Sequence, residues 1–227
     1  MAKPLRKDAQ RNRDLLVAAA RELFAERGLD VPLEEIARRA GVSIGTLYNR
    51  FPARADLIGA VFADRVAATR ALAEQALAMP GAWDGLVHFL EGVCAMQAAD
   101  LGYNALASGR GPYAAADDAD LAEGYALMRR IVARAQESGE LRPDVTLEDM
   151  VFVIWGHART VEATATIAPR LWRRHLALLL DGLRTPEPSP LPEPSLTPEQ
   201  ARRAMSPQSP CRPDDAASRS RALRGTG

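Results

Sequence analysis

Four polar side chains between residues 46 and 50 could do the chemistry of nucleic-acid recognition. Thr46, Tyr48, Asn49 and Arg50 place a hydroxyl, a phenol, an amide and a guanidinium within little more than one helical turn. An asparagine can pair with adenine, and an arginine can pair with guanine or bind a phosphate. The pattern predicts a DNA-reading helix, and it leaves open which side chain meets a base and which meets the backbone.

Two short helices joined by a tight turn would position these side chains. Apolar residues at helical spacing give the stretch after Leu33 one apolar face, and Gly41 supplies a left-handed corner. Ser43 then caps a second helix, whose Leu47 and Phe51 point back into a small core. This is a helix-turn-helix pattern, and such a second helix can enter the major groove of DNA. A purely structural helical hairpin is the alternative interpretation.

The string AxxAGVSxGTLYxxFxxRxxL, which runs from Ala37 to Leu57, resembles the DNA-binding domain of TetR-family transcription regulators. With the helical pattern that follows, the resemblance extends over roughly residues 8 to 183. Tyr48 is similar to the family's phosphate-contacting tyrosine, and Arg54 to its basic residue at the start of the fourth helix. The resemblance implies a DNA-contacting set made of Ser43, Ile44, Gly45, Thr46, Tyr48, Asn49, Arg50 and Arg54.

Four positions depart from the family's usual pattern. Pro32 and Ala53 stand where hydroxyl or amide side chains often cap a helix, so both caps are lost. Arg50 stands where the family more often has histidine, and Ile44 where it has a polar or basic residue or proline. Ile44 either touches a thymine methyl or packs beside the turn. We expect the sequence preference to be least predictable at these positions.

The first helix is expected to run up to Gly28, behind a basic leading arm. Up to Arg54 the chain has eleven Lys or Arg and seven Asp or Glu, whereas its overall net charge is zero. A local positive excess suits a module that faces phosphates, although a solvated helix face gives similar counts. Lys7, Arg11 and Arg13 are the candidates for phosphate contact.

The rest of the chain predicts a larger helical domain. Apolar stripes predict helices over about 53–79, 82–100, 120–138, 146–166 and 169–183, with a short helical turn in a loop over 100–118. Thr146 and Asp149 form a capping-box pair. The fold class is therefore all-α, with about nine helices in two domains. These are a three-helix helix-turn-helix domain over 1–52, and a ligand-binding and dimerisation domain over 53–184.

An apolar cavity with a few polar groups is the expected small-molecule site in such a domain. The candidate ligand-binding residues are Phe89, Val93, Cys94, Met96, Gln97, Tyr103, Tyr125, Met128, Trp155 and Arg159, with Tyr113 and Glu162 beside them. The alternative is that the aromatic and Met side chains simply fill the core, and that Arg159 and Glu162 pair with each other.

Catalysis is the competing class of function. His88, His157 and His175 fall on three different predicted helices, and no Gly-rich phosphate loop, nucleophile elbow or HExxH string accompanies them. Cys94 and Cys211 give neither a disulfide framework nor a metal-ligand spacing. We therefore expect no catalytic residues, no cofactor, no metal and no enzyme.

The C-terminal segment differs from the rest in composition. Nine prolines lie among Ser, Glu and Arg after Thr185, so residues 185–227 are expected to form a disordered tail apart from a helical turn around Glu199 to Met205. No apolar run approaches the roughly 20 residues that span a bilayer, and the N-terminus lacks a signal peptide's apolar core. We expect a cytoplasmic protein with no membrane contact.

The family resemblance implies a homodimer that joins through its last two helices and reads a palindromic operator in double-stranded DNA. A small apolar or amphipathic effector in the cavity would release this repressor from its operator. The first alternative is a helical small-molecule-binding protein with lost or weak DNA affinity. The second, less favoured alternative is an enzyme that uses the helical cavity.

Overall fold

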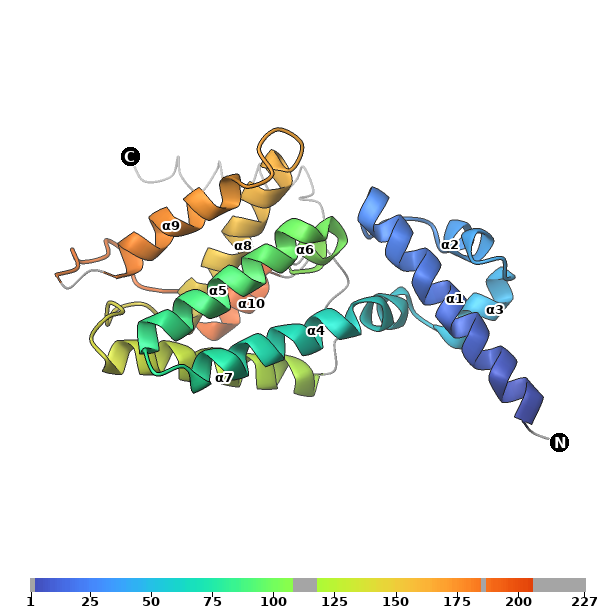
Figure 1. Cartoon of the computed structure of the whole chain (residues 1–227), viewed down its shortest axis with the longest axis horizontal. Helices are drawn as coiled ribbons and strands as arrows, with labels where there is room; N and C mark the ends of the chain where they lie inside the picture. Colours follow the sequence, from blue (N-terminus) through green and yellow to red (C-terminus); the bar gives the residue numbers. More distant parts are fainter. Residues whose placement is uncertain (1–2, 108–117, 185–186, 206–227) are drawn as a thin grey trace, which may run out of the picture.

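The computed structural model describes residues 3–107, 118–184 and 187–205, and over these ranges the chain is helical with no strand (Figure 1). The expected all-α fold is confirmed. The helices are α1 (Lys3–Arg27), α2 (Leu33–Arg39), α3 (Ile44–Arg50), α4 (Arg54–Ala78), α5 (Ala82–Ala99), α6 (Leu101–Ala107), α7 (Asp118–Glu137), α8 (Leu147–Thr164), α9 (Leu171–Leu183) and α10 (Pro198–Met205). Tyr113 lies outside the described residues.

Helices α1, α2 and α3 form the N-terminal body. Leu16, Leu23 and Phe24 recur at helical spacing on α1, so they share one face and pack against Ile36 of α2 and Leu47 of α3. All five side chains are at most 1% exposed. The burial of this stripe holds the helix-turn-helix against α1.

Helix α4 belongs to both bodies. Its first half adds Leu57, Val61 and Phe62 to the N-terminal core, and its second half adds Ala73 and Ala76 to the C-terminal core. Figure 1 shows α4 running from beneath α1 into the larger body. A single continuous helix thus connects the two groups of side chains.

The start of α4 is only partly capped, as the sequence predicts. Ala53 has no side-chain acceptor, but its backbone N–H donates to Asp56 Oδ2 at 2.8 Å. In a full capping box the N-cap side chain accepts from the N3 amide and the N3 side chain accepts from the N-cap amide. Only the second of these two bonds is present here. Asp56 therefore compensates in part for the missing Ser or Asn.

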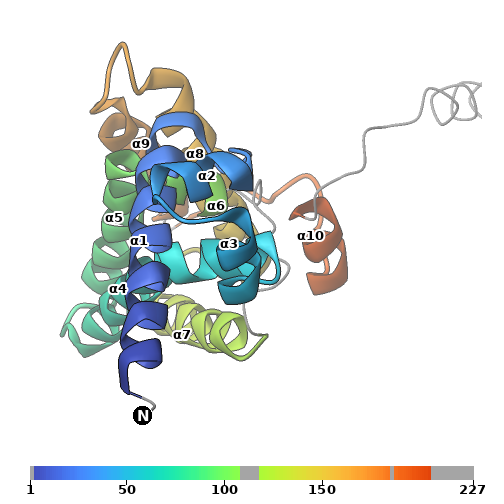
Figure 2. The same cartoon turned by 90° about the vertical axis from the view of Figure 1, so that its right-hand side faces the viewer.

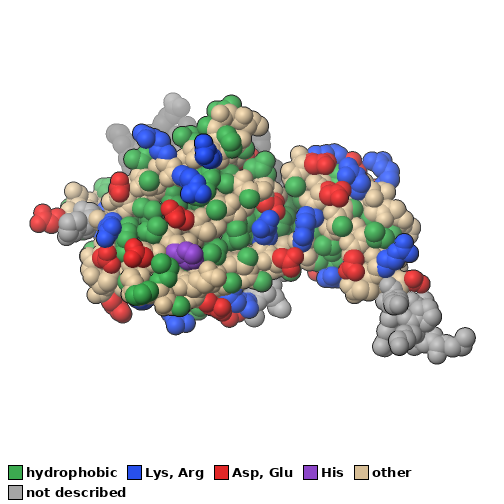
Figure 3. All heavy atoms as spheres, viewed as in Figure 1, with side chains coloured by type: hydrophobic (Ala, Val, Ile, Leu, Met, Phe, Trp, Pro, Cys, Tyr) green, Lys and Arg blue, Asp and Glu red, His purple; other side chains and the backbone are tan. Residues whose placement is uncertain are grey.

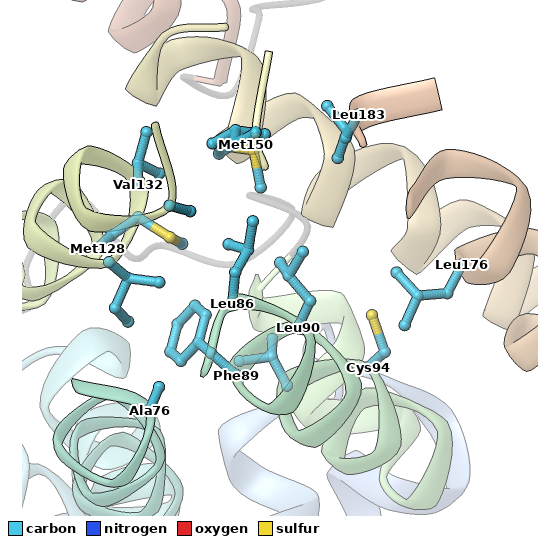
Figure 4. Close-up of a cluster of buried hydrophobic side chains, with 14 of the residues drawn as sticks. Ala76, Leu86, Phe89, Leu90, Cys94, Met128, Val132, Met150, Leu176 and Leu183 are labelled. Carbon is cyan, nitrogen blue, oxygen red and sulfur yellow. The ribbon is translucent and has the colours of Figure 1, made fainter. Parts of the chain in front are cut away.

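Helix α5 lies at the centre of the C-terminal body. It packs against α4, α6, α7, α8 and α9. Phe89 and Leu90 of α5 meet Met128 of α7, Met150 of α8 and Leu176 of α9 in one buried cluster (Figure 4). A Cβ at Gly85 would collide with the carbonyl oxygen of Ala76. The close approach of α4 and α5 thus requires glycine at that position.

Specific polar contacts fix the helix ends of this body. The Arg134 guanidinium donates to four carbonyl oxygens at the end of α4, including those of Leu77 at 3.0 Å and Pro80 at 2.9 Å. At the start of α8, the Thr146 hydroxyl accepts from the amide of Asp149, and the Asp149 carboxylate accepts from the amide of Thr146. The predicted capping box is therefore confirmed.

The C-terminal segment departs from the expected disorder over residues 187–197, and the helical turn expected around Glu199 to Met205 is present as α10. Ser195 Oγ lies 2.6 Å from Thr146 Oγ1 and 3.2 Å from Asp149 Oδ1, so the segment is tied to the cap of α8. Arg142 Nη2 donates to the carbonyl oxygen of Ser189, and Ala201 of α10 is only 4% exposed. Figure 2 shows α10 to one side of the other helices, at the right of the view. Proline-rich composition favours disorder, but these contacts hold residues 187–205 on the body.

Candidate nucleic-acid interface and central cavity

Local hydrogen bonds build the start of α3. Gly41 has a φ of 69°, the left-handed conformation expected at the corner, and the amide of Val42 donates to the carbonyl oxygen of Ala37 at 3.0 Å. Ser43 Oγ accepts from the amide of Thr46 at 3.2 Å, which confirms the predicted N-cap. The turn therefore holds α3 at a fixed angle to α2.

The outward face of α3 presents most of the predicted DNA-contacting set. Tyr48 is 48% exposed and Ile44 37% exposed, and Gly45, Asn49 and Arg50 are exposed beside them. Their arrangement leaves an amide, a phenol and a guanidinium open to a groove or a phosphate.

Two hydroxyl groups at the start of α3 face each other. Thr46 is half-buried, and its Oγ1 lies 2.9 Å from Ser43 Oγ. Both hydroxyls are therefore engaged in the cap, and each keeps further hydrogen-bonding capacity for a phosphate oxygen or a base.

Arg54 has a different environment from the other predicted DNA contacts. Its Nη1 donates to the carbonyl oxygens of Leu29 at 2.9 Å and Val31 at 2.8 Å, and the side chain is half-buried. These bonds join the start of α4 to the loop between α1 and α2. The structure thus gives Arg54 a positioning role inside the N-terminal body, and its contact with DNA stays a prediction.

Much of the N-terminal basic charge is balanced by acidic neighbours. Arg27 Nη1 lies 2.6 Å from Glu35 Oε1, and Arg39 Nη1 lies 3.1 Å from Glu22 Oε2. Figure 3 shows basic and acidic side chains intermixed on one face of this body. Of the predicted phosphate contacts on α1, Arg13 stacks over the ring of Phe51 at 5.5 Å. Arg11 is exposed, and the Lys7 side chain is outside the described part.

A cavity of about 240 Å³, the central cavity, lies among the helices of the C-terminal body. Its wall is mainly apolar. The lining residues are Val66, Thr69, Arg70 and Ala73 of α4, Phe89 and Val93 of α5, Tyr103 of α6, Gly124, Tyr125, Leu127 and Met128 of α7, and Val151 and Ile154 of α8. A cavity of this kind is a typical small-molecule site.

Five of the predicted ligand-binding residues line the central cavity, namely Phe89, Val93, Tyr103, Tyr125 and Met128. Sequence reasoning placed no ligand-binding candidate on α4, so the four lining residues of that helix were missed, as were Gly124, Leu127, Val151 and Ile154. The recurrence of the α4 residues at positions 66, 69, 70 and 73 is the helical spacing that could have identified them.

The remaining predicted residues lie away from the lining. Cys94 packs toward Leu176 of α9 (Figure 4), and burial raises the pKa of its thiol to about 12. Met96 packs against both cores, and Trp155 lies edge-on to Phe152 at 5.7 Å. Arg159 forms an ion pair with Glu162 at 2.6 Å, so the pairing weighed from the sequence is confirmed. Gln97 is fully buried, with both amide atoms unpartnered within the described ranges.

The wall of the central cavity carries two kinds of polar group. Tyr103 Oη and Thr69 Oγ1 are 2.9 Å apart, and burial raises the pKa of Tyr103, so the phenol is neutral at physiological pH. Arg70 Nη2 lies 2.8 Å from a carboxylate oxygen of Glu123, so its charge is compensated. The cavity therefore combines an apolar wall, a hydroxyl pair and a guanidinium that is paired with a carboxylate.

An aromatic row connects this wall to the N-terminal body. Tyr103 of α6 contacts Phe62 of α4 at a centroid distance of 6.2 Å, and Phe62 stacks on Phe24 of α1 at 6.3 Å. A Cβ at Gly102 would lie 3.2 Å from the backbone of Phe24, so α6 and α1 are in close contact. A movement of α6 would therefore reach α1 directly.

Two histidines meet between α8 and α9. His157 Nδ1 lies 3.2 Å from His175 Nδ1, with the rings stacked, and His157 also packs edge-on against Trp172. Burial, and then repulsion from His175, lower the pKa of His157 to about 4. The described residues contain no group of three or more ligands that could hold a metal ion.

Two family models match the two bodies. One, for bacterial regulatory proteins of the tetR family, matches residues 16–61, and one for the C-terminal domain of SbtR-like transcriptional regulators matches residues 79–185. A TetR transcriptional regulator of Streptomyces coelicolor is 34% identical over 76% of this chain and 98% of that one, with a TM-score of 0.49. The chain belongs to the TetR family. The resemblance seen in the sequence is thus confirmed.

Other likenesses are more limited. An HTH-type transcriptional regulator of Staphylococcus aureus is 39% identical over 54 residues, which is 23% of this chain and 29% of that protein. The regulator FadR of Bacillus subtilis, solved with stearoyl-CoA, has a TM-score of 0.59 at 20% identity and covers 75% of this chain and 99% of that one. The likeness to FadR shows the fold alone.

Among the helices of the described residues, none combines the length and the apolar character that a membrane span needs.

Proposed function

We propose that this TetR-family protein is a cytoplasmic repressor that binds a palindromic operator through α3 and leaves it when a small molecule fills the central cavity. The observation that carries the proposal is that the same two helices contact both the central cavity and the DNA-binding body. Helices α4 and α6 line the cavity, and both pack on α1 of the DNA-binding body. A ligand that favours another arrangement of α4 and α6 therefore changes the position of α3.

The proposed repressor acts as a homodimer through α8 and α9. On α9, Leu171 is 40% exposed and Leu178 is 61% exposed. Leu171 precedes the half-buried His175 by four residues and Leu178 follows it by three, so the three side chains share one face of the helix. Phe152 and Trp155 are half-buried on α8. Apolar side chains left open on two adjacent helices favour burial against a second copy. Two copies of α3 about 34 Å apart would then read successive major grooves.

Selection of bound duplexes from a random DNA pool, followed by anisotropy titration at several salt concentrations, tests the DNA step. Asn49→Ala should weaken binding about 10-fold or more if it reads a base. Arg50→Ala should weaken it and, if the guanidinium meets phosphate, reduce the salt dependence by about one ion. The matched control is Arg130→Ala, because Arg130 is exposed on α7.

The same titration separates the alternative function. A helical small-molecule-binding protein without DNA affinity would select no sequence from the pool and show no salt-sensitive binding. Equal operator affinity of wild type, Asn49→Ala and Arg50→Ala would refute the assignment of α3 as the reading helix.

A further inference from the structure

The protons of the hydroxyl pair in the central cavity can be assigned. Thr69 Oγ1 donates to the carbonyl oxygen of Arg65 at 2.9 Å. A threonine hydroxyl has a single proton, so in its 2.9 Å contact with Tyr103 Oη the phenol must be the donor. Both protons are then committed. Tyr103 Oη keeps its lone pairs, and the pair therefore offers a ligand an acceptor and no free proton.

The charges at the cavity wall argue against an ionic ligand. Arg70 is already paired with Glu123 at 2.8 Å, so the wall carries no net charge from this pair. Bringing a carboxylate into a largely apolar cavity costs its hydration unless a cation is available to replace it. The volume of about 240 Å³ is below the range usual for drug-sized ligands, about 300–1,000 Å³.

We infer that the effector is a small, uncharged and largely apolar alcohol or phenol, whose hydroxyl group donates to Tyr103 Oη. This inference deepens the proposed function and rests on the central cavity being the effector site. Tyr103 Oη accepts a hydrogen bond from the ligand, and Thr69 sets that selectivity because its hydroxyl oxygen accepts the hydrogen bond of the phenol. A ketone or an ether of the same skeleton finds no donor at this pair unless the contact between Tyr103 and Thr69 breaks.

Equilibrium dialysis of the full chain in the absence of DNA, with ultraviolet-absorbing probes of one skeleton, tests this inference. The probes are β-naphthol, β-naphthyl methyl ether, naphthalene and β-naphthoate. In the wild type, β-naphthol should bind roughly tenfold tighter than the ether and naphthalene, as one buried hydrogen bond implies, and β-naphthoate should bind weakest.

Two variants that keep the shape of the wall make the test specific. Tyr103→Phe should abolish the preference for β-naphthol over naphthalene. Thr69→Val frees the phenol proton, so the ether's affinity should rise toward that of β-naphthol. Naphthalene affinity should stay unchanged in both variants, which shows that the cavity is intact.

Several results would overturn the inference. The first is that none of the four probes binds, and the second is that β-naphthol and naphthalene bind with equal affinity. The third is that β-naphthoate binds tightest and loses this advantage in Arg70→Gln. The fourth is that both Tyr103→Phe and Thr69→Val lose naphthalene binding. The dialysis contains no DNA, so its failure leaves operator binding untouched. Conversely, absence of operator release by β-naphthol would count against the proposed regulation while the binding preference stood.

Discussion

Lowering the pH should reduce the free energy of unfolding of this protein through the protonation of one histidine, His157. His157 is fully buried between α8 and α9, against His175 and Trp172, and its pKa is about 4 in the folded chain compared with 6.5 for an ordinary histidine. The unfolded chain therefore takes up the proton first as the pH falls. Stability that is present above pH 6.5 is lost progressively toward pH 4.

The size of the loss follows from the two pKa values. Between about pH 7 and pH 5, a histidine with these values lowers the free energy of unfolding by about 2 kcal/mol. Asp and Glu side chains ordinarily titrate below pH 5, so this interval isolates the histidine. Urea denaturation at both pH values and one fixed protein concentration measures the loss.

The chain contains three histidines, which gives a complete set of variants. His157→Gln should remove most of the pH dependence. His175→Gln should keep most of it, because burial lowers the pKa of His157 more than repulsion from His175 does. His88→Gln is the control, since His88 is half-buried on α5 with its Nε2 3.2 Å from Gln75 Oε1. If His157→Gln loses as much stability as the wild type between the two pH values, the reasoning is refuted.

Three further changes test the packing of the C-terminal body. Arg134→Met should lower the free energy of unfolding by about 2 kcal/mol in urea denaturation, because four carbonyls at the end of α4 lose their donor. The control is Arg130→Met, since Arg130 is exposed, and a loss no larger than in this control would contradict the prediction. Gly85→Ala should cost about 2–3 kcal/mol by the same assay because its Cβ meets the α4 backbone, and Gly59→Ala, with open space at its Cβ, is the control it must exceed. Ser195→Ala should cost about 1 kcal/mol at the cap of α8, and an unchanged melting temperature would argue against a stabilising role.

Features set by neighbouring residues could be predicted from the sequence. The Ser43 cap, the Gly41 corner and the Thr146–Asp149 box depend on side chains within a few positions of one another, and all three are present. The exposure of Tyr48 and the burial of Leu47 follow from helical period in the same way.

The cavity wall was harder to predict, because it depends on how helices distant in sequence rotate against one another. Phe89 and Cys94 both sit on apolar faces of α5, yet the first lines the cavity and the second packs toward α9. Periodicity identifies a buried face and does not say which neighbour the face meets. The role of Arg54 was missed for the same reason, since its carbonyl partners lie 23 and 25 residues earlier in the chain.

Residues 187–205 of the C-terminal segment lie beyond residue 185, where the match to the SbtR-like domain ends. Its contacts with the body include polar bonds at Ser189 and Ser195, and among the described side chains of the segment only the small Ala201 is buried. A segment with so little buried apolar surface can detach while the helices beneath it stay folded. It should therefore behave as a separate opening unit, whose backbone amides exchange with solvent deuterium well before those of α7 and α8.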